Sequence, residues 1–490
     1  MTEGIPFIAR FRTPQAYYAY DVNTNEVVRI SRCISEVLGD WGKIPHQDLV
    51  DKYSLLHGRA AVLAAVSEIN AARQEAGLFS SSKPEKLQFP HSLTELKAAL
   101  SSRLEHLILN ITERCNLSCR YCLFSGHYPY QRRHSPRDLE PAVALKAVDF
   151  FMPRTAETNL PILGFFGGEP LLRLDLIRAV LEHVRKHYPD RRISVSFSTN
   201  GLLLRGEILK YLVEQDVLVR VSLDGPRQIH DRMRVFADGR GSFDIVVRNL
   251  KEAKRRYPEY FQKNISMGVT IHTPKEIEEI YNLFQNGKSF LRNCRVSLSY
   301  VDPHDTTLFD KGVLAPQDWQ DDKFCEGRYL AAVSKGELPD QFLKDLFDFT
   351  MLKIHRRPMT PLGLTHYPNG ICFPGVRRLY CTVDGDFSVC ERVNPGLHLG
   401  HIDQGIDADR AWEVAQQYAE ISSADCRDCW AVRLCSLCFC HLQRDQFDLE
   451  RKRSFCPGTR AAILDALSMY CSAREVNDHA FDYLDEIEVS

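Results

Sequence analysis

Short apolar runs alternate with helical patterns between residues 104 and 300, and this alternation constrains the fold more than any other feature of the 490-residue chain. The six runs lie at residues 106–111, 162–167, 193–199, 218–224, 265–271 and 294–300. Amphipathic segments such as residues 173–188 separate them. Such repeats predict a parallel sheet with right-handed crossovers. The runs also predict strands that are apolar on both faces, as in sheets that helices cover.

Six strand–helix units are too few for a complete eight-stranded barrel. We therefore predict the α/β fold class with a partial (β/α)6 barrel. In parallel barrels the functional loops follow the carboxyl ends of the strands, so polar residues at those ends are the first candidates for a site.

The first 100 residues are predicted to form a separate α+β unit. Residues 16–31 hold two aromatic or β-branched runs around a polar turn, which predicts a hairpin. Residues 58–77 are rich in Ala, carry apolar residues at helical spacing and end at Gly77, which suits a helix C-cap. A polar linker at residues 81–87 precedes the strand–helix array.

Composition and charge exclude several classes of protein. Hydrophobic residues make up 44% and charged residues 26% of the chain, which rules out a disordered or fibrous protein. The net charge of -2 gives no general attraction to nucleic acid or to an anionic membrane, so neither is expected as a partner. The chain opens without an apolar signal region and has no apolar run of about 18 residues, so a cytoplasmic location without a membrane span is expected.

The 16 cysteines concentrate in two places. Cys115, Cys119 and Cys122 form a C-x3-C-x2-C group directly after the first predicted strand, and nine more cysteines lie within residues 372–456. Clustered thiols in a reducing compartment indicate metal ligation rather than disulfides. Three thiolates on one loop can hold three irons of a [4Fe–4S] cluster and leave the fourth iron open. A zinc knuckle with a distant fourth ligand is the alternative.

The C-x3-C-x2-C group after the first strand of a βα array resembles the radical S-adenosylmethionine (SAM) superfamily. The resemblance implies that SAM chelates the open iron, and that one electron from the reduced cluster yields a 5′-deoxyadenosyl radical, which abstracts a hydrogen atom. It also implies a low-potential reductant, a flavodoxin or a ferredoxin. The protein would position the cofactor and exclude side reactions.

Polar motifs at the predicted strand ends extend this resemblance. GFFGGEP ends the second strand, FSTNG the third and VSLDGP the fourth, and an HDxxR segment follows. By resemblance, their residues contact the amino, carboxylate and ribose groups of SAM, and an aromatic residue of the cysteine loop lies beside the adenine. The implied cofactor-binding residues are Tyr121, Gly167, Gly168, Glu169, Ser198, Asn200, Ser222 and Arg234. Asp224 is a further polar group at the expected barrel mouth.

The cysteines of residues 372–456 resemble the SPASM extension of radical SAM proteins, an Fe–S domain that carries two auxiliary [4Fe–4S] clusters. The resemblance implies three clusters in all. The ligands it implies for the outer auxiliary cluster are Cys426, Cys429, Cys435 and Cys456. Those it implies for the inner auxiliary cluster are Cys372, Cys390 and a thiol from Cys438 or Cys440, of which Cys438 is favoured.

The chain departs from the family pattern at the inner cluster. The family spacing places a cysteine at position 439, which is Phe439 here. The fourth ligand therefore stays open: Cys381 and Cys325 are candidates besides Cys440, and an iron without a protein ligand is another possibility. A buried strand cysteine is the alternative interpretation of Cys381.

The N-terminal unit resembles the winged-helix domains that recognise leader peptides by strand addition in enzymes that mature ribosomally made peptides. The predicted substrate is therefore a precursor peptide with a leader, and the predicted reaction joins a Cys sulfur to carbon as a thioether. Carbon–carbon crosslinking is one alternative, and epimerisation with Cys294 or Cys325 as hydrogen donor is another. Formylglycine formation of the sulfatase-activating type and a non-catalytic zinc scaffold are weaker ones.

Together these predictions divide the chain into five regions. They are a leader-recognition domain (1–100), a radical SAM partial barrel (101–310), a bridging region (311–370), a SPASM domain (371–460) and a C-terminal helix (461–490).

Overall fold

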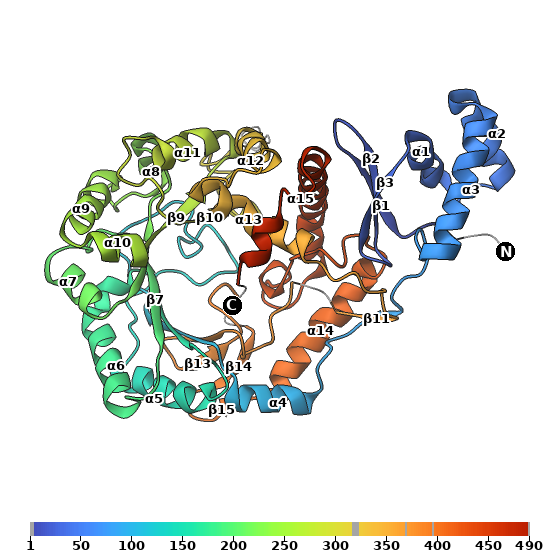
Figure 1. Cartoon of the computed structure of the whole chain (residues 1–490). Coiled ribbons are helices and arrows are strands. Elements are labelled where there is room, and N and C mark those ends of the chain that lie inside the picture. The colour runs from blue at the N-terminus through green and yellow to red at the C-terminus, as the bar shows by residue number, and fades with distance from the viewer. Residues whose placement is uncertain (1–3, 316–322, 368–369, 394–395, 489–490) are drawn as a thin grey trace.

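The computed structural model describes residues 4–315, 323–367, 370–393 and 396–488. All six predicted strands of the array are present, neighbouring strands run parallel, and helices surround them (Figure 1). They are β5 (His106–Thr112), β6 (Ile162–Gly167), β7 (Ser194–Thr199), β8 (Leu218–Ser222), β9 (Ile265–Ile271) and β10 (Val296–Tyr300). This α/β arrangement is consistent with the predicted partial barrel.

The helices of the array lie on the outside of the sheet (Figure 1). They are α5 (Pro141–Phe151), α6 (Leu174–His187), α7 (Gly206–Glu214), α8 (Arg227–Met233), α9 (Phe243–Arg256), α10 (Pro258–Asn264) and α11 (Ile277–Gln285), with short 3-10 turns at Met152–Thr155, Pro170–Arg173 and Pro274–Glu276. Helix α6 shows why they pack there, because its buried residues recur on one face: Leu176, Ile177, Val180, Leu181 and Val184.

The inner face of the sheet is more polar than the sequence suggests. In β7, Val195 and Phe197 are buried while Ser196 and Ser198 alternate with them and line a cavity. Strand β9 alternates in the same way, with buried Met267 and Val269. The expectation of two apolar faces is therefore wrong for these strands. Small serines at inward positions leave the lumen unfilled, whereas large aliphatic side chains fill a closed eight-stranded barrel.

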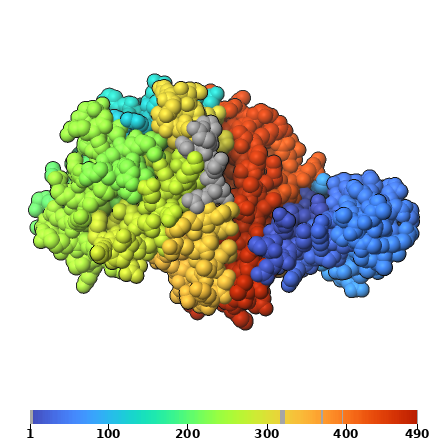
Figure 2. Space-filling model, turned by 90° about the horizontal axis from the view of Figure 1, so that it is seen from above, coloured from blue at the N-terminus to red at the C-terminus, as the bar shows by residue number. Residues whose placement is uncertain are grey.

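The N-terminal unit forms a module at one end of the molecule (Figure 2). Strands β1 (Ile8–Arg12), β2 (Tyr17–Asp21) and β3 (Glu26–Ile30) form an antiparallel sheet in that order, and α1 (Arg32–Asp40), α2 (His46–His57) and α3 (Arg59–Ala76) follow. The predicted hairpin is thus present, and Gly77 ends α3 with a left-handed φ of 67°. Strand β1 was not predicted, because IARFR is short and alternates apolar residues with arginines.

The sheet of the barrel continues into the second cysteine-rich part of the chain. Strand β12 (Leu379–Cys381) pairs in parallel with β5 and extends a ten-stranded sheet through β13 (Asp386–Ser388), β14 (His398–His401) and β15 (Gly405–Ile406). The predicted linker at 81–87 holds β4 (Lys86–Leu87), which pairs with β11 (Thr365–His366).

The remaining helices are α4 (Leu93–Ser102), α12 (Phe324–Ser334), α13 (Gln341–His355), α14 (Ala408–Cys426) and α15 (Leu449–Val476), with 3-10 turns at Phe439–His441 and Asp482–Glu486. Helix α15 begins before the predicted C-terminal region, so Cys456 lies inside it, and it runs between the barrel and the N-terminal module (Figures 1 and 2). No helix of the described residues combines the length and apolarity needed to cross a bilayer.

Candidate active site

The first cysteine group lies on the loop that follows β5. Neighbouring segments fix its backbone: the Ser118 amide donates to the Val235 carbonyl at 2.7 Å, and the Arg120 amide donates to the Met233 carbonyl at 2.9 Å. Burial raises the pKa of Cys115 and of Cys119 to about 11. Thiols in such surroundings are neutral unless a cation stabilises the thiolates, so the loop presents three soft ligands that metal would deprotonate.

The two glycines at the end of β6 make room for this loop. A Cβ on Gly167 would lie 1.9 Å from the Thr112 carbonyl oxygen, and one on Gly168 would lie 2.0 Å from the Arg114 carbonyl oxygen. The Gly168 amide donates to the Thr112 carbonyl at 2.8 Å. Sequence reasoning assigned the glycines to close approach by a ligand, but in this structure the backbone that approaches them is the start of the cysteine loop.

Glu169 ties the end of β6 to the end of β7. Its buried carboxylate accepts hydrogen bonds from the Thr199 hydroxyl at 2.7 Å, the Asn200 amide at 2.8 Å and the Leu171 amide at 3.1 Å. Burial raises the pKa of Glu169. A carboxylate has about four acceptor positions, so one remains for a further donor such as an ammonium group.

A second buried carboxylate, Asp224, supports the other side of the cysteine loop. It accepts from the Tyr121 hydroxyl at 2.7 Å and from Nε of Arg234 at 2.9 Å, and His272 Nε2 lies 3.3 Å away. Burial by itself would raise the pKa of Asp224, but Arg234 and His272 outweigh it and hold that pKa well below its usual value. Asp224 therefore positions Tyr121 and Arg234, whose side chains border the cavity beside the loop.

One cavity of about 500 Å³ brings the first candidate site together. It is bordered by the three loop cysteines and by every residue that the resemblance implies for SAM contact: Tyr121, Gly167, Gly168, Glu169, Ser198, Asn200, Ser222 and Arg234. Its size lies in the range of ligand pockets, and its lining combines apolar walls with a few convergent polar groups.

The second cysteine-rich part of the chain holds two further thiol groups. Cys426, Cys429, Cys435 and Cys456 border one small cavity together with Lys452. Lys452 is buried, bonds to the Ser422 hydroxyl, and its Nζ lies 4.5 Å from the ring centre of Tyr418. Four thiols around one void, with a buried cation beside them, suit a metal cluster whose thiolates carry negative charge.

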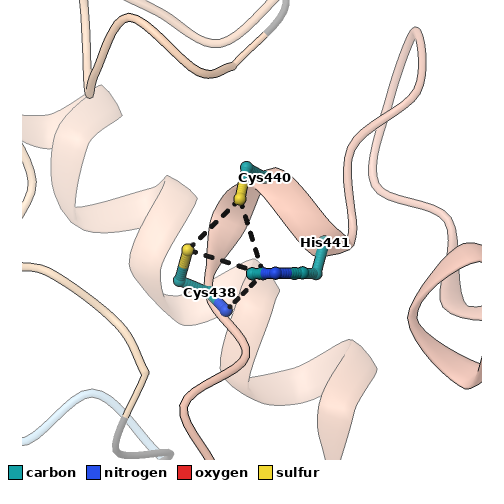
Figure 3. A group of neighbouring side chains, drawn as sticks. All are labelled: Cys438, Cys440 and His441. Carbon is teal, nitrogen blue, oxygen red and sulfur yellow. Dashed lines mark hydrogen bonds between the residues drawn. The ribbon is translucent and has the colours of Figure 1, made fainter. Parts of the chain in front are cut away.

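The other thiol group surrounds the turn at Phe439–His441 (Figure 3). The sulfurs of Cys438 and Cys440 lie 3.5 Å apart, and Nδ1 of His441 lies 3.6 and 3.4 Å from them. Hydrogen bonds with Cys440 and His441 lower the pKa of Cys438. Phe439 is buried against Tyr418 at 5.3 Å between ring centres, so an aromatic core residue occupies the position where the family has cysteine.

Cys372 and Cys390 lie near this turn. Burial raises the pKa of both thiols, and a neighbouring Cys438 thiolate raises them further. Negative charge on the neighbouring sulfurs, of Cys440 first and then of Cys438 and Cys390, raises the pKa of Arg392. Arg392 also borders the cavity beside the first cysteine loop, so one residue adjoins both that cavity and this thiol group.

Comparison with known proteins agrees with this geometry. Residues 109–284, from β5 and the cysteine loop to α11, match the radical SAM superfamily. This chain is a radical SAM enzyme. The match includes the cysteine loop and the residues of β6, β7 and β8 that border the cavity.

Several relatives of this radical SAM enzyme are known. The cysteine-type anaerobic sulfatase-maturating enzyme of Clostridium novyi (strain NT) is 28% identical over 294 residues, which is 58% of this chain and 72% of that protein. The radical SAM cyclopropyl synthase TigE of Paramaledivibacter caminithermalis is 29% identical over 161 residues, 31% of this chain and 33% of that one. The chain spans only 60% of the related Clostridium perfringens (strain 13 / Type A) enzyme.

The fold likeness extends further than the family match. The structure of native anSMEcpe with bound AdoMet and Cp18Cys peptide aligns with a TM-score of 0.54 at 20% identity, over 79% of this chain and 99% of that one. At this identity the likeness concerns the fold alone.

The remaining cysteine candidates of the radical SAM enzyme lie elsewhere. Cys381 is fully buried in β12, and its Sγ lies 3.7 Å from the Thr382 carbonyl oxygen. Cys325 is buried in α12 near Tyr281. Cys294 precedes β10 at the amino end of the strand, whereas the cysteine loop follows the carboxyl end of β5. None of the three borders the cavity beside the loop, as far as the described residues define it.

Sequence reasoning missed several residues of the site. Asn116 accepts from the Asn200 side chain at 2.6 Å, and His134 Nε2 lies 3.6 Å from the Cys122 sulfur. His272 follows the carboxyl end of β9, so the strand-end rule that selected Ser198 could have found it. His134 lies in a long loop without such a signal.

Proposed function

We propose that this radical SAM enzyme matures a ribosomally made precursor peptide and carries a SPASM-type domain with two auxiliary clusters. The observation that carries the proposal is the shared cavity. Glu391 and Arg392, directly after Cys390, border the same space as Cys115, Cys119 and Cys122. A substrate in that space would lie between the SAM cluster and an auxiliary cluster, which suits an oxidation that removes hydrogen and passes electrons on.

The residues present fit the cofactors. Three buried thiols on the loop after β5 would hold a [4Fe–4S] cluster with one open iron. When bound, the cluster and SAM supply hydrogen-atom abstraction from an unactivated carbon. Tyr121 and Arg234, oriented by Asp224, would contact SAM together with Glu169 and Asn200, while Ser198 and Ser222 offer hydroxyls from the lumen wall.

The outer auxiliary cluster is assigned to Cys426, Cys429, Cys435 and Cys456, which border one void. For the inner cluster we assign Cys372, Cys390 and Cys438, with Cys440 as the fourth ligand. The Cys440 sulfur lies 3.5 Å from that of Cys438, whereas Cys381 is directed toward a backbone carbonyl in β12. The Cys438 amide donates to His441 Nδ1 at 3.1 Å, which supports the geometry of the turn.

The N-terminal module is assigned to leader recognition. Strand β3 pairs with β2 on one side and with no other described strand on the other. The turn between β2 and β3 is fixed to the rest of the protein, because the Asn23 carbonyl accepts from the Leu362 amide and the Asn25 carbonyl from Arg357, both at 2.7 Å. A leader added to β3 as a strand would raise the local concentration of the attached core peptide at the cavity.

Thioether formation between a Cys sulfur and carbon is the reaction we propose. Formylglycine formation is the second candidate, because it is favoured by the similarity to sulfatase-maturating enzymes over 58% of the chain. The N-terminal module, assigned to leader recognition, favours thioether formation over formylglycine formation, since a precursor peptide carries a leader. A flavodoxin or a ferredoxin would supply the electrons.

Mass spectrometry of a precursor peptide coexpressed with the enzyme tests this function. A loss of two hydrogens for each link, with loss of one free thiol, is the expected result. A Ser or Cys converted to an aldehyde would establish the second candidate instead, and altered stereochemistry without a mass change would indicate epimerisation. An anaerobically reconstituted protein that is colourless, rather than brown with about 12 irons per chain, would contradict the cluster assignment.

A further inference from the structure

The lumen of the barrel continues from the cavity that the SAM-site residues border toward the amino ends of the strands, and this direction is called lower. A second cavity of about 430 Å³ occupies the amino-end half of the barrel. The two cavities share five lining residues, Phe166, Ser198, Arg220, Ser297 and Glu391, so they adjoin. A substrate group that passes the SAM site would therefore enter this lower chamber.

The lower chamber carries an excess of positive charge. Arg220, Arg295 and Arg378 border it, and Glu391 is the nearby carboxylate that pairs with one of them, Arg378 Nη1, at 2.7 Å. The other acidic group, Asp345, accepts from the Val296 amide at 2.6 Å and lies near Arg295, so the lining holds three arginines and Lys263 against two carboxylates. Within the described residues, no hydrogen bond or ion pair within 4.0 Å engages the guanidinium of Arg220.

Arg220 is placed to meet a ligand rather than the barrel wall. Its side chain crosses the lumen side of β9 at Gly268, where an added Cβ would lie 3.2 Å from the Arg220 Cδ. Burial and the charges of Arg378 and Arg295 lower the pKa of Arg220, and the Glu391 carboxylate opposes them only in part. These effects disfavour the charged form, so an incoming anion would relieve them.

The chamber also offers neutral recognition groups. Ser196 and Ser266 border it with hydroxyls, which can donate to a bound anion. The walls include Ile108 and Phe166, and such apolar surroundings strengthen charge–charge interactions. A guanidinium with hydroxyls beside it suits the planar, two-oxygen geometry of a carboxylate.

We propose that Arg220, with Arg295 and Arg378, binds a carboxylate of the peptide substrate in the lower chamber. This inference rests on the proposed peptide-modifying function and names the chemistry that the site selects. Arg220 and Ser222 project from the same face of β8, two residues or about 7 Å apart. The carboxylate would thus belong to the residue that reacts at the SAM site or to its neighbour, as an acidic side chain or the C-terminus.

Equilibrium dialysis of radiolabelled tripeptides against the SAM-loaded holoenzyme tests the proposal. One pair is acetyl-Gly-Glu-Gly-amide and acetyl-Gly-Gln-Gly-amide, and a second is acetyl-Gly-Gly-Gly with a free or an amidated C-terminus. We expect the acid of one pair to bind about tenfold more tightly than its amide. A tenfold difference in the dissociation constant is the effect usually expected for a hydrogen bond to a charged group. The pair that discriminates identifies the source of the carboxylate.

Variants of the arginine locate the effect. In Arg220→Gln the acid-to-amide ratio should fall toward one, and Arg220→Lys should retain part of it. Arg255→Gln, an exposed arginine of α9, is the matched control and should keep the full ratio. Three results would each overturn the proposal. They are equal binding of acid and amide by the wild type, no binding of either acid at millimolar concentration, and an unchanged acid-to-amide ratio in Arg220→Gln.

Failure of this inference and failure of the proposed function give different results. A wild-type protein that holds its iron, cleaves SAM and modifies its precursor, yet treats acids and amides alike, loses only the carboxylate site. A wild-type protein that neither holds iron nor cleaves SAM loses the proposed function itself, and the dialysis then no longer describes a substrate site.

Discussion

The two cysteine-rich parts of the chain differ in how their thiols are positioned. The loop after β5 is held by the protein itself: backbone hydrogen bonds from Ser118 and Arg120 join it to the segment after α8, and the glycines of β6 close over its start. In the second part Cys426 ends α14 and Cys456 lies inside α15, but the thiols between them, Cys429, Cys435 and Cys438, lie in turns.

This difference separates two kinds of metal site. The site on the loop after β5 depends on the surrounding fold, whereas the local fold of the second part depends on its metal. Protein contacts shape the loop, and its thiols face a cavity, as a reactive site requires. The segment between α14 and α15, which holds Cys429, Cys435, Cys438 and Cys440, has only turns and one 3-10 turn, so its folding should depend on metal in the way that structural metal sites do. The predictions below test that contrast, from the largest expected effect to the smallest.

Replacing Cys115, Cys119 and Cys122 together by Ala should abolish SAM cleavage but leave the fold intact. Iron should fall from about twelve to about eight per chain, because the auxiliary clusters stay bound. Chromatography of cleaved SAM, iron analysis and thermal unfolding check this. Cys33→Ala in α1 is the control and should change none of them. Persisting cleavage, or loss of all the iron, would contradict the separation of the two parts.

Replacing Cys426 by Ala should unfold the second part locally. Loss of the outer cluster is expected to lower the free energy of unfolding by about 4 kcal/mol or more, since no helix or strand holds the turns between Cys426 and Cys438. Limited proteolysis should then cut within residues 426–440 while β5–β10 stay resistant. Wild-type resistance in the variant, with four irons lost, would show that the segment folds without its metal.

Asp224→Asn should loosen the support of the first site. Arg234 would be left buried without its charge partner, which costs about 3–5 kcal/mol. Because the folded pKa of Asp224 is held low, its stabilisation is complete above the unfolded value and is lost only as pH falls through the folded one. The cost of the mutation, measured by urea unfolding, should therefore be constant from about pH 6 to 9.

A matched carboxylate on the surface tests whether burial causes this cost. Asp244 pairs with Arg227, and both side chains are more than half exposed. Asp244→Asn should change stability much less than Asp224→Asn, because solvent screens the exposed pair. Equal costs for Asp224→Asn and Asp244→Asn would sink the claim that the buried network holds the cysteine loop.

The smallest effect is expected for Cys381→Ala. If Cys381 is a core residue of β12, the variant keeps all of its iron and loses about 1 kcal/mol of stability. Cys440→Ala should lose the iron of the inner cluster. Iron analysis of the two variants decides between them, and iron loss in Cys381→Ala with none in Cys440→Ala would reverse the assignment of the fourth ligand.

Much of the fold followed from local pattern. The six strands and the N-terminal hairpin were predicted because apolar periodicity and turn residues act over a few positions. Strand β1 was missed because five residues with two arginines carry too little pattern, whereas the expected strand around Cys381 is present as β12. The polar inner face was misread because serines within strands such as ISVSFST resemble ordinary strand residues until the lumen is known.

The sequence by itself determined the chemistry of this protein: thiols at C-x3-C-x2-C spacing after the first strand, and the glycine and acidic residues at the strand ends. Only the tertiary structure decided which of them meet. Pairing of β12 with β5 brings Glu391 and Arg392 to the cavity of a loop more than two hundred residues earlier in the chain, and Arg220 meets Arg378 across the lumen. Ligand spacing is local, whereas sheet pairing over such separations depends on the packing of the whole barrel.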